Sequence, residues 1–244
     1  MNFSAISNTS VLGRLMRLPL TLVPKTADLP ILQGPLRARK WRARSGNHGC
    51  WLGSYEYVKQ RELAAEVKPG MVCLDVGANV GFYSLLFSTF CGEAGEVVAF
   101  EPLPANCDVL RHHIRINRCS KIRVEPMALA DFDGEARFRP GIDKFTGRLS
   151  PDGTLVVACA RLDTLMDRGL VRPPHIVKID VEGAEMEVIR GAAGTLRSFR
   201  PILFLATHGE EVHRGSCALL RGLGYRIRGV GGLDPQQTNE LVAQ

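Results

Sequence analysis

Short apolar runs alternate with amphipathic stretches through most of the chain. The apolar runs predict strands at 72–76, 97–100, 122–126, 176–180, 202–206 and 225–230. The stretches between them are typical of helices, which we expect at 54–67, 82–87, 104–118, 162–168, 183–190 and 212–223. Strands that alternate with helices indicate a doubly wound α/β fold, with a mostly parallel sheet covered on both faces.

The region between the third and fourth of these strands breaks the alternation. Residues 131–134 form a hairpin-type turn, and a short strand at 135–139 follows it. The polar stretch 140–153 is expected to be a loop that acts as a lid or contacts the substrate. Another short strand is predicted at 155–160, and the polar tail from Gly231 is expected to fray.

The charge of the chain divides it into an arm and a main domain. Residues 1–48 hold eight Lys and Arg against one acid, whereas the remainder holds 23 basic and 24 acidic residues. We therefore predict a basic arm at 1–48, with a short strand or hairpin in 30–44, and a domain at 49–244. The uneven charge weakens the case for a protein that binds nucleic acid as a whole. The stretch 37–44 is either a phosphate-binding segment, for a nucleotide-sugar, a lipid-linked glycan or RNA, or a charged strand edge.

Membrane and redox signals are weak. No segment reaches the roughly 18 apolar residues that a transmembrane helix needs. Residues 1–27 lack acids but do not match a signal peptide, so a transit peptide or peripheral membrane contact of the arm stays open.

The seven cysteines are scattered, odd in number and without a C-x-x-C pair, which predicts reduced thiols in a cytoplasmic protein. We predict no metal site.

The stretch from Val72 to Phe87 carries the first chemical signal. It predicts a strand, a tight turn that opens at Gly77, and a helix that Gly81 allows to pack closely. Such a turn at the carboxyl end of a parallel strand is where open α/β sheets bind ligands. Asn79 stands where the dinucleotide pattern G-x-G-x-x-G has its middle glycine, which argues against a pyrophosphate ligand. The chain also lacks the Walker pattern and the G-x-S-x-G elbow of serine hydrolases.

Glu101 ends the second strand, 20 residues after Gly81. An acid at this place accepts hydrogen bonds from the hydroxyls of a ribose in dinucleotide folds. A site that binds a ribose but lacks a pyrophosphate turn indicates S-adenosylmethionine as the cofactor.

Five segments in a characteristic order support this interpretation. They are 74–83, 99–106, 128–134, 162–165 and 177–185, and through them the chain resembles the FkbM-type S-adenosylmethionine-dependent methyltransferases. The resemblance extends from about residue 48 to residue 207. It implies a seven-stranded, Rossmann-like methyltransferase sheet and O-methylation of a sugar, glycan or other small hydroxylated metabolite.

The same resemblance implies which residues bind the cofactor. Asp75, Gly77 and Asn79 would hold its amino-acid end, Glu101 would take the ribose, and Asn106 and Asp131 would lie near the ribose or adenine. The complete predicted set is Asp75, Gly77, Asn79, Gly81, Glu101, Pro102, Asn106 and Asp131.

The reaction also needs groups that act on the acceptor. A hydroxyl is a poor nucleophile at neutral pH, so a general base helps. Of four candidates after the fourth and fifth strands, we predict Asp180, Glu182 and His208 as catalytic, and we expect Glu185 to complement a helix N-terminus. Family members often carry Glu before that His, where this chain has Thr207, which leaves the role of His208 open.

Three hypotheses about function stay open from the sequence. The first is a small-molecule O-methyltransferase. The second is an RNA or protein methyltransferase, indicated by the basic arm. The third is a non-catalytic module that binds S-adenosylmethionine. His112 and His113, on the helix after the second strand, are expected at the surface.

Overall fold

A computed structural model describes residues 23–24, 26–141 and 147–244 of the chain. Its main sheet has seven strands in the order β12-β13-β11-β10-β3-β4-β5. Five of them pair in parallel, whereas β13 runs antiparallel between β11 and β12. The bounds are β3 Val72–Val76, β4 Glu96–Phe100, β5 Ile122–Glu125, β10 Ile176–Ile179, β11 Ile202–Ala206, β12 Ile227–Gly229 and β13 Glu240–Ala243. The expected seven-stranded, mostly parallel sheet is confirmed.

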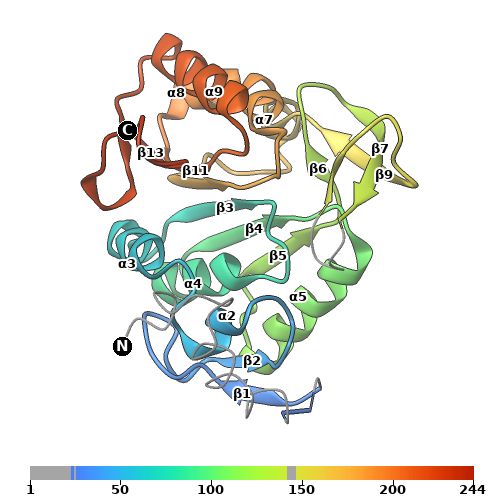
Figure 1. Ribbon diagram of the computed structural model, residues 1–244, viewed down its shortest axis with the longest axis vertical. Helices are drawn as coiled ribbons and strands as arrows, with labels where there is room; N and C mark the ends of the chain where they lie inside the picture. The colour runs from blue at the N-terminus through green and yellow to red at the C-terminus, as the bar shows by residue number, and fades with distance from the viewer. Residues whose placement is uncertain (1–22, 25, 142–146) are drawn as a thin grey trace.

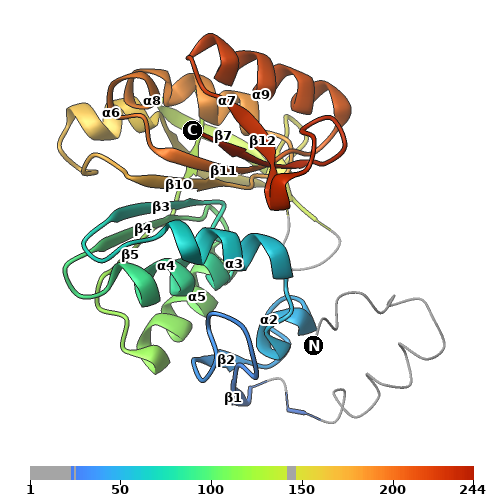
Figure 2. The same cartoon turned by 90° about the vertical axis from the view of Figure 1, so that its left-hand side faces the viewer.

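Helices cover both faces of this sheet (Figures 1 and 2). On one face lie α3 (Tyr57–Glu66), α4 (Phe82–Cys91) and α5 (Pro104–Asn117). On the other face lie α6 (Leu162–Asp167), α7 (Glu185–Gly191), α8 (Ala193–Phe199) and α9 (Glu210–Gly222). In β3, Leu74 packs in the core under α6 to α9 and Cys73 in the core under α3 to α5. Because side chains alternate and both faces are covered, every residue of β3 is buried.

A second sheet of four strands stands beside the main one, in the order β6-β9-β7-β8. Its strands are β6 Ala128–Leu129, β7 Gly134–Pro140, β8 Gly147–Leu149 and β9 Leu155–Ala160. The turn at 131–134 does not close a hairpin, because β9 lies between β6 and β7 and pairs with both. The expected loop at 140–153 is wrong for residues 147–149, which pair with β7, and residues 142–146 lie outside the described residues.

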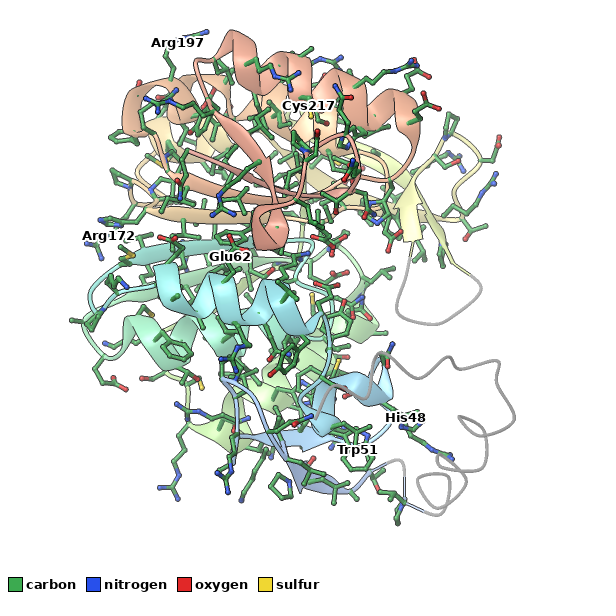
Figure 3. All side chains as sticks on the ribbon, turned by 60° about the vertical axis from the view of Figure 1, so that its left-hand side comes forward. His48, Trp51, Glu62, Arg172, Arg197 and Cys217 are labelled. Atoms are coloured by element: carbon green, nitrogen blue, oxygen red, sulfur yellow. The ribbon has the colours of Figure 1, made fainter. Side chains whose placement is uncertain are left out.

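The C-terminal tail is ordered, contrary to expectation. Leu241, Val242 and Ala243 of β13 are fully buried between β11 and β12. Glu62 of α3 also anchors the tail, since it pairs with Arg228 and accepts a hydrogen bond from the Gly231 N–H at 2.8 Å (Figure 3). The tail is polar up to residue 239, but its last apolar residues complete the main sheet.

The segment before β3 is also divided differently from the prediction. A short helix, α2 (His48–Leu52), precedes the expected helix at 54–67, which begins only at Tyr57. Asn47 caps α2 by accepting a hydrogen bond from the Gly49 N–H at 2.8 Å. Ser54 caps neither helix and is buried between them.

The arm forms a short hairpin where one was expected. The strands β1 (Asp28–Pro30) and β2 (Lys40–Arg42) pair antiparallel, with Leu29 opposite Trp41. Trp41 is fully buried and belongs to the core that α4 and α5 cover. The expectations for a transit peptide or membrane contact at residues 1–22 fall outside the described residues.

The prediction of reduced thiols is consistent with the structure. All seven cysteines are buried and free of disulfide bonds. Within the described ranges, no helix has both the length and the apolar character that crossing a membrane requires.

Candidate active site

A cavity of about 690 Å³ lies at the carboxyl ends of β3, β4 and β10. One wall is the turn after β3 and the end of β4, from Val76 to Val80 and from Phe100 to Leu103. The second sheet and the segment before it add apolar residues, among them Met127 and Phe138. The segment around α2, where His48 and Trp51 lie (Figure 3), contributes His48 and Tyr55. The cavity therefore combines residues from both sheets and from the segment that follows the arm's hairpin.

The turn after β3 requires glycine for two reasons. Gly77 has a φ of 72°, in the left-handed region. A Cβ there would also lie 1.9 Å from the carbonyl oxygen of Asp180, so the backbone of the turn lies directly against the backbone that follows β10. Gly81 acts differently: a Cβ there would lie 2.1 Å from Leu110 Cδ1, so this glycine allows α5 to pack against the turn.

Glu101 holds the turn and the end of β4 together. Its carboxylate accepts hydrogen bonds from the N–H of Asn79 at 2.8 Å and of Leu103 at 2.9 Å. It also accepts one from Asn106 Nδ2 at 3.1 Å. Burial raises the pKa of Glu101, although these donors oppose the rise. A carboxylate has about four acceptor sites, so one remains for a ligand in the cavity that Glu101 lines.

Asp75 lies behind the cavity wall. It is fully buried, accepts a hydrogen bond from Ser84 Oγ at 2.6 Å and lies 3.2 Å from Lys178 Nζ. Lys178 does line the cavity, and it donates to the Gly77 carbonyl at 2.7 Å. The sequence reasoning missed Lys178, although a lysine inside the apolar strand Ile-Val-Lys-Ile is a signal in itself.

The predicted cofactor-binding residues therefore divide into two groups. In the part of the chain that the structure describes, four of them line the cavity: Gly77, Asn79, Glu101 and Pro102. The other four do not: Asp75, Gly81, Asn106 and Asp131. Asp75 and Asn106 support residues that do, through Lys178 and Glu101. Asp131 is exposed beyond β6, and Met127, Ala128 and Leu129 line the cavity at this place instead.

The three predicted catalytic residues lie together. Asp180 and Glu182 line the cavity after β10, and His208 follows the neighbouring strand β11. His208 Nε2 lies 3.7 Å from Asp180 Oδ1 and 3.6 Å from Glu182 Oε2. His208 Nδ1 lies 2.9 Å from Oε1 of Glu185, which is fully buried. We call these four residues the Asp180 cluster.

The charges of the Asp180 cluster shift the pKa values of its members. The hydrogen bond to Glu185 raises the pKa of His208 to about 9; burial opposes the rise, and the charges of Asp180 and Glu182 add to it. Burial would raise the pKa of Asp180, but the positive charges of Lys178, Lys59 and His208 outweigh it and lower the pKa. The geometry therefore stabilises ionised Asp180 and protonated His208 in one another's presence.

A second charged group supports the cavity from α3. Lys59 is buried and lies 3.0 Å from Glu56 and 2.7 Å from Glu240 of β13. Tyr83, which lines the cavity, donates its hydroxyl to Glu56 at 2.5 Å. This network links the C-terminal strand to the cavity wall, and no local sequence pattern marks it, because Tyr83 and Glu240 are far along the chain from Glu56 and Lys59.

The expectation of surface histidines on α5 is wrong. His113 is fully buried and stacks on Trp41 with ring centroids 4.0 Å apart. It lies 2.7 Å from the carbonyl of Val80 in the turn, and it accepts the Arg42 N–H at 3.0 Å. Burial lowers its pKa to about 4. His112 is nearly buried and lies 2.7 Å from Asp28. The hairpin of the arm covers this side of α5, which the sequence pattern did not show.

Comparisons with known proteins show the family to which the chain belongs. The Methyltransferase FkbM domain family matches residues 75–227. The hexuronic acid methyltransferase AglP of Haloferax volcanii is 29% identical over 157 residues, which cover 64% of this chain and 61% of that protein. The 2-O-methyltransferase NoeI of Sinorhizobium fredii is 26% identical over 197 residues, which cover 72% of this chain and 75% of that protein.

A solved structure supports the fold. The crystal structure of methyltransferase FkbM from Methylobacillus flagellatus superposes with a TM-score of 0.53 at 17% identity. The match covers 82% of this chain and 56% of that one. The chain thus spans somewhat more than half the length of these two proteins, AglP and the Methylobacillus methyltransferase.

Proposed function

Because this chain belongs to the FkbM methyltransferase family, we propose that it transfers a methyl group from S-adenosylmethionine to a hydroxyl oxygen of a sugar, glycan or other small hydroxylated metabolite. The names of two relatives support this acceptor class, since one denotes a hexuronic acid methyltransferase and the other a 2-O-methyltransferase. One observation carries the proposal. The glycine turn and two members of the Asp180 cluster, Asp180 and Glu182, line one cavity at the ends of neighbouring strands β3 and β10.

The residues at the cavity fit S-adenosylmethionine. Gly77 lines the cavity and lets the turn lie directly against the end of β10, and Glu101 keeps an acceptor site for a ribose hydroxyl. Lys178 adds a buried positive charge beside the turn, which suits the carboxylate of the cofactor's amino-acid end. Asp75 and Asn106 hold Lys178 and Glu101 in place rather than line the cavity.

The remaining residues act on the acceptor. S-adenosylmethionine, when bound, supplies a methyl group on a sulfonium, which is already a good leaving group. The chain must therefore hold the acceptor oxygen in line and help to remove its proton. Asp180 and Glu182 offer carboxylate oxygens at the cavity, and His208 Nε2 faces both of them. We assign these three residues to the orientation and deprotonation of the acceptor.

Calorimetry and a transfer assay test this proposal. S-adenosylmethionine should bind with measurable heat, whereas NAD should not. Label from methyl-labelled S-adenosylmethionine should appear in methyl glycosides or uronic acids. Asp180→Asn should lower kcat by about 100-fold, the scale of general base catalysis, while the Kd of S-adenosylmethionine stays within a few fold.

Glu187→Gln is the matched control for Asp180→Asn. Glu187 lies on α7, its side chain is 40% exposed, and it pairs with Arg190 rather than with the Asp180 cluster. The control variant should retain full activity. Binding of NAD without binding of S-adenosylmethionine, or full transfer activity in Asp180→Asn, would reject the assignment.

The basic arm gives little support to RNA as the acceptor. Arg42 lies 3.8 Å from Asp28 and 3.2 Å from His112. Its guanidinium therefore already interacts with groups of the protein itself. Methyl label in an RNA oligomer, lost at high salt and absent from glycosides, would favour the RNA alternative over the one proposed.

A further inference from the structure

We propose that Asp180, Glu182 and His208 bind one divalent cation at the edge of the cavity, and that this cation holds two adjacent oxygen atoms of the acceptor. The proposal deepens the function proposed above and rests on it for the identity of the acceptor. The acceptor class would be a vicinal diol, or a hydroxyl beside a carboxylate. Cation binding itself depends only on the three side chains.

The spacing of the three side chains suits a shared ion better than direct hydrogen bonds. His208 Nε2 lies 3.7 Å from Asp180 Oδ1 and 3.6 Å from Glu182 Oε2, beyond the usual hydrogen-bond range. Two ligand atoms that each lie about 2.1 Å from one cation are about 3 Å apart at a right angle. All three ligand atoms lie within 4.8 Å of one another. Glu182 is 47% exposed, so a modest side-chain rotation is enough to close the site.

The orientation of His208 comes from a buried carboxylate. Glu185 Oε1 accepts from His208 Nδ1 at 2.9 Å and from the Gly183 N–H at 3.0 Å. A carboxylate is an acceptor only, so Nδ1 keeps its proton and Nε2 is the nitrogen that faces Asp180 and Glu182. Because the raised pKa of His208 puts a second proton on Nε2, a bound cation takes the place of that proton. Histidines that bind metals commonly have their other ring nitrogen held by a carboxylate in this way.

Glu185 also adds negative charge directly behind His208. It is fully buried, and its Oε2 has no hydrogen-bond partner within the described ranges. An unpaired carboxylate oxygen in such a place is costly, and a cation nearby reduces that cost. The buried side chain is an observation separate from the spacing of the three ligands.

The sum of charges around the site favours a cation. Three carboxylates, those of Asp180, Glu182 and Glu185, surround one imidazole. Lys178 Nζ lies 4.0 Å from Asp180 Oδ2, whereas Asp180 Oδ1 is the oxygen nearest to His208. Lys178 therefore leaves the oxygen on the side of His208 available.

The ligand set also indicates which cation fits and what it does. Two carboxylates and one imidazole suit Mn²⁺ or Mg²⁺ better than the sulfur-preferring metals. Three protein ligands leave positions of an octahedral ion open, and Asp180 and Glu182 place these positions at the cavity. A cation beside a hydroxyl lowers the pKa of that hydroxyl, which addresses the poor nucleophilicity of the acceptor.

A titration with Mn²⁺ followed by electron paramagnetic resonance tests the site directly. The full chain, stripped with EDTA, should bind one Mn²⁺ that Mg²⁺ displaces. Glu182→Gln should weaken Mn²⁺ binding at least tenfold, and Glu182 is exposed enough that this change spares the fold. Glu187→Gln, an exposed acid on α7, should bind Mn²⁺ like the unchanged chain. No bound Mn²⁺, or binding that Glu182→Gln leaves intact, would overturn the proposal.

Activity measurements then separate this proposal from the one on which it rests. EDTA should reduce methyl transfer to a glycoside with adjacent hydroxyls at least tenfold, and Mg²⁺ should restore it. A deoxy analogue that lacks the neighbouring hydroxyl should be a poor acceptor. Transfer that ignores EDTA in a chain without bound Mn²⁺ rejects the cation and leaves the methyltransferase assignment standing. Mn²⁺ bound at the Asp180 cluster, without methyl transfer to any hydroxyl acceptor, rejects the proposed function and leaves the cation site.

Discussion

Gly77 is the residue on which the shape of the cavity depends most directly. Gly77→Ala places a Cβ 1.9 Å from the Asp180 carbonyl, at a φ of 72°. The backbone strain alone costs about 1–3 kcal/mol, and the clash moves the turn away from β10. We expect a lower melting temperature and loss of measurable S-adenosylmethionine binding in calorimetry.

Gly70→Ala is the control that separates the effect of backbone strain from the effect of the steric clash at Gly77. Gly70 also has a positive φ, of 85°, but a Cβ there meets nothing within 4 Å. The control should lose some stability and keep its affinity for S-adenosylmethionine. Equal effects of the two substitutions on binding would show that contact between the turn and β10 is unimportant.

His113 makes stability depend on pH in a defined window. Its pKa falls from an ordinary value of 6.5 to about 4 because burial disfavours the charged ring. Between these values the unfolded chain binds the proton more readily, so the free energy of unfolding decreases as pH falls from 6.5 to 4. At 1.36 kcal/mol per pKa unit, the decrease is about 3 kcal/mol.

Urea unfolding at pH 7 and pH 4.5 measures this effect. Other groups titrate in the same window, so the comparison is with His113→Asn, which removes the ring but keeps a polar side chain. The variant should lose less stability than the unchanged chain over this interval. A variant with the same pH dependence would exclude His113 as the cause.

At the scale of single residues, sequence reasoning located positions better than it assigned contacts. The rule that ligands bind at the carboxyl ends of strands placed Asp180 and His208 on one edge of the sheet, where the structure has them. It did not show that Asp75 points away from the cavity and pairs with Lys178. The direction of a side chain in a strand buried on both faces depends on the packing of both layers, and the sequence pattern of such a strand does not show alternation.

At the scale of elements, the buried Lys59 ties α3 to β13. Burial alone would lower the pKa of Lys59, but Glu56 and Glu240 outweigh that effect and raise it, so the lysine stays charged. Lys59→Met leaves the half-buried Glu240 without its ion pair and leaves Glu56 with only the Tyr83 hydroxyl, which costs about 3 kcal/mol, the lower end for a broken buried pair. We expect urea unfolding at a lower midpoint, with the largest loss of protection from hydrogen exchange in β13.

An exposed lysine gives the control for this substitution. Lys121→Met removes the same charge at the surface beside β5 and should change stability by less than about 0.5 kcal/mol. Near-normal stability of Lys59→Met would mean that the two carboxylates find other partners or take up protons.

The errors in element prediction have a common cause. The strand β13 has only three apolar residues after a polar stretch, and β8 has a single apolar residue, Leu149. Both are strands because distant segments pair with them, and a short run carries no periodicity from which such pairing can be predicted. The longer elements β3, β4 and α5 were predicted within a few residues, since their periodicity and end signals are local.

At the scale of the whole molecule, the order of the strands matters more than their number. Alternating strands and helices predict a parallel sheet, and the resemblance implied seven strands. The position of β13 between β11 and β12, and the second sheet beside the first, follow from tertiary packing. That second sheet contributes Phe138 to the lining of the cavity that Asp180 and Glu182 also line. A loop that acts as a lid or contacts the substrate was expected at 140–153, and the structure places a strand at 147–149 within it.

Phe138 provides the last test, because it belongs to the second sheet and lines the cavity at the end of the main sheet. It is 5% exposed, lines the cavity and packs with Leu103. Phe138→Leu keeps most of the apolar volume, so the fold should survive, with a loss of about 1 kcal/mol. If the second sheet shapes the acceptor side, KM for the glycoside rises about tenfold while the Kd of S-adenosylmethionine changes less than twofold.

Phe132→Ala, at a 40% exposed phenylalanine outside the cavity, should leave both constants unchanged. A larger effect of Phe138→Leu on cofactor affinity than on KM would place the acceptor elsewhere, toward α2 and Tyr55.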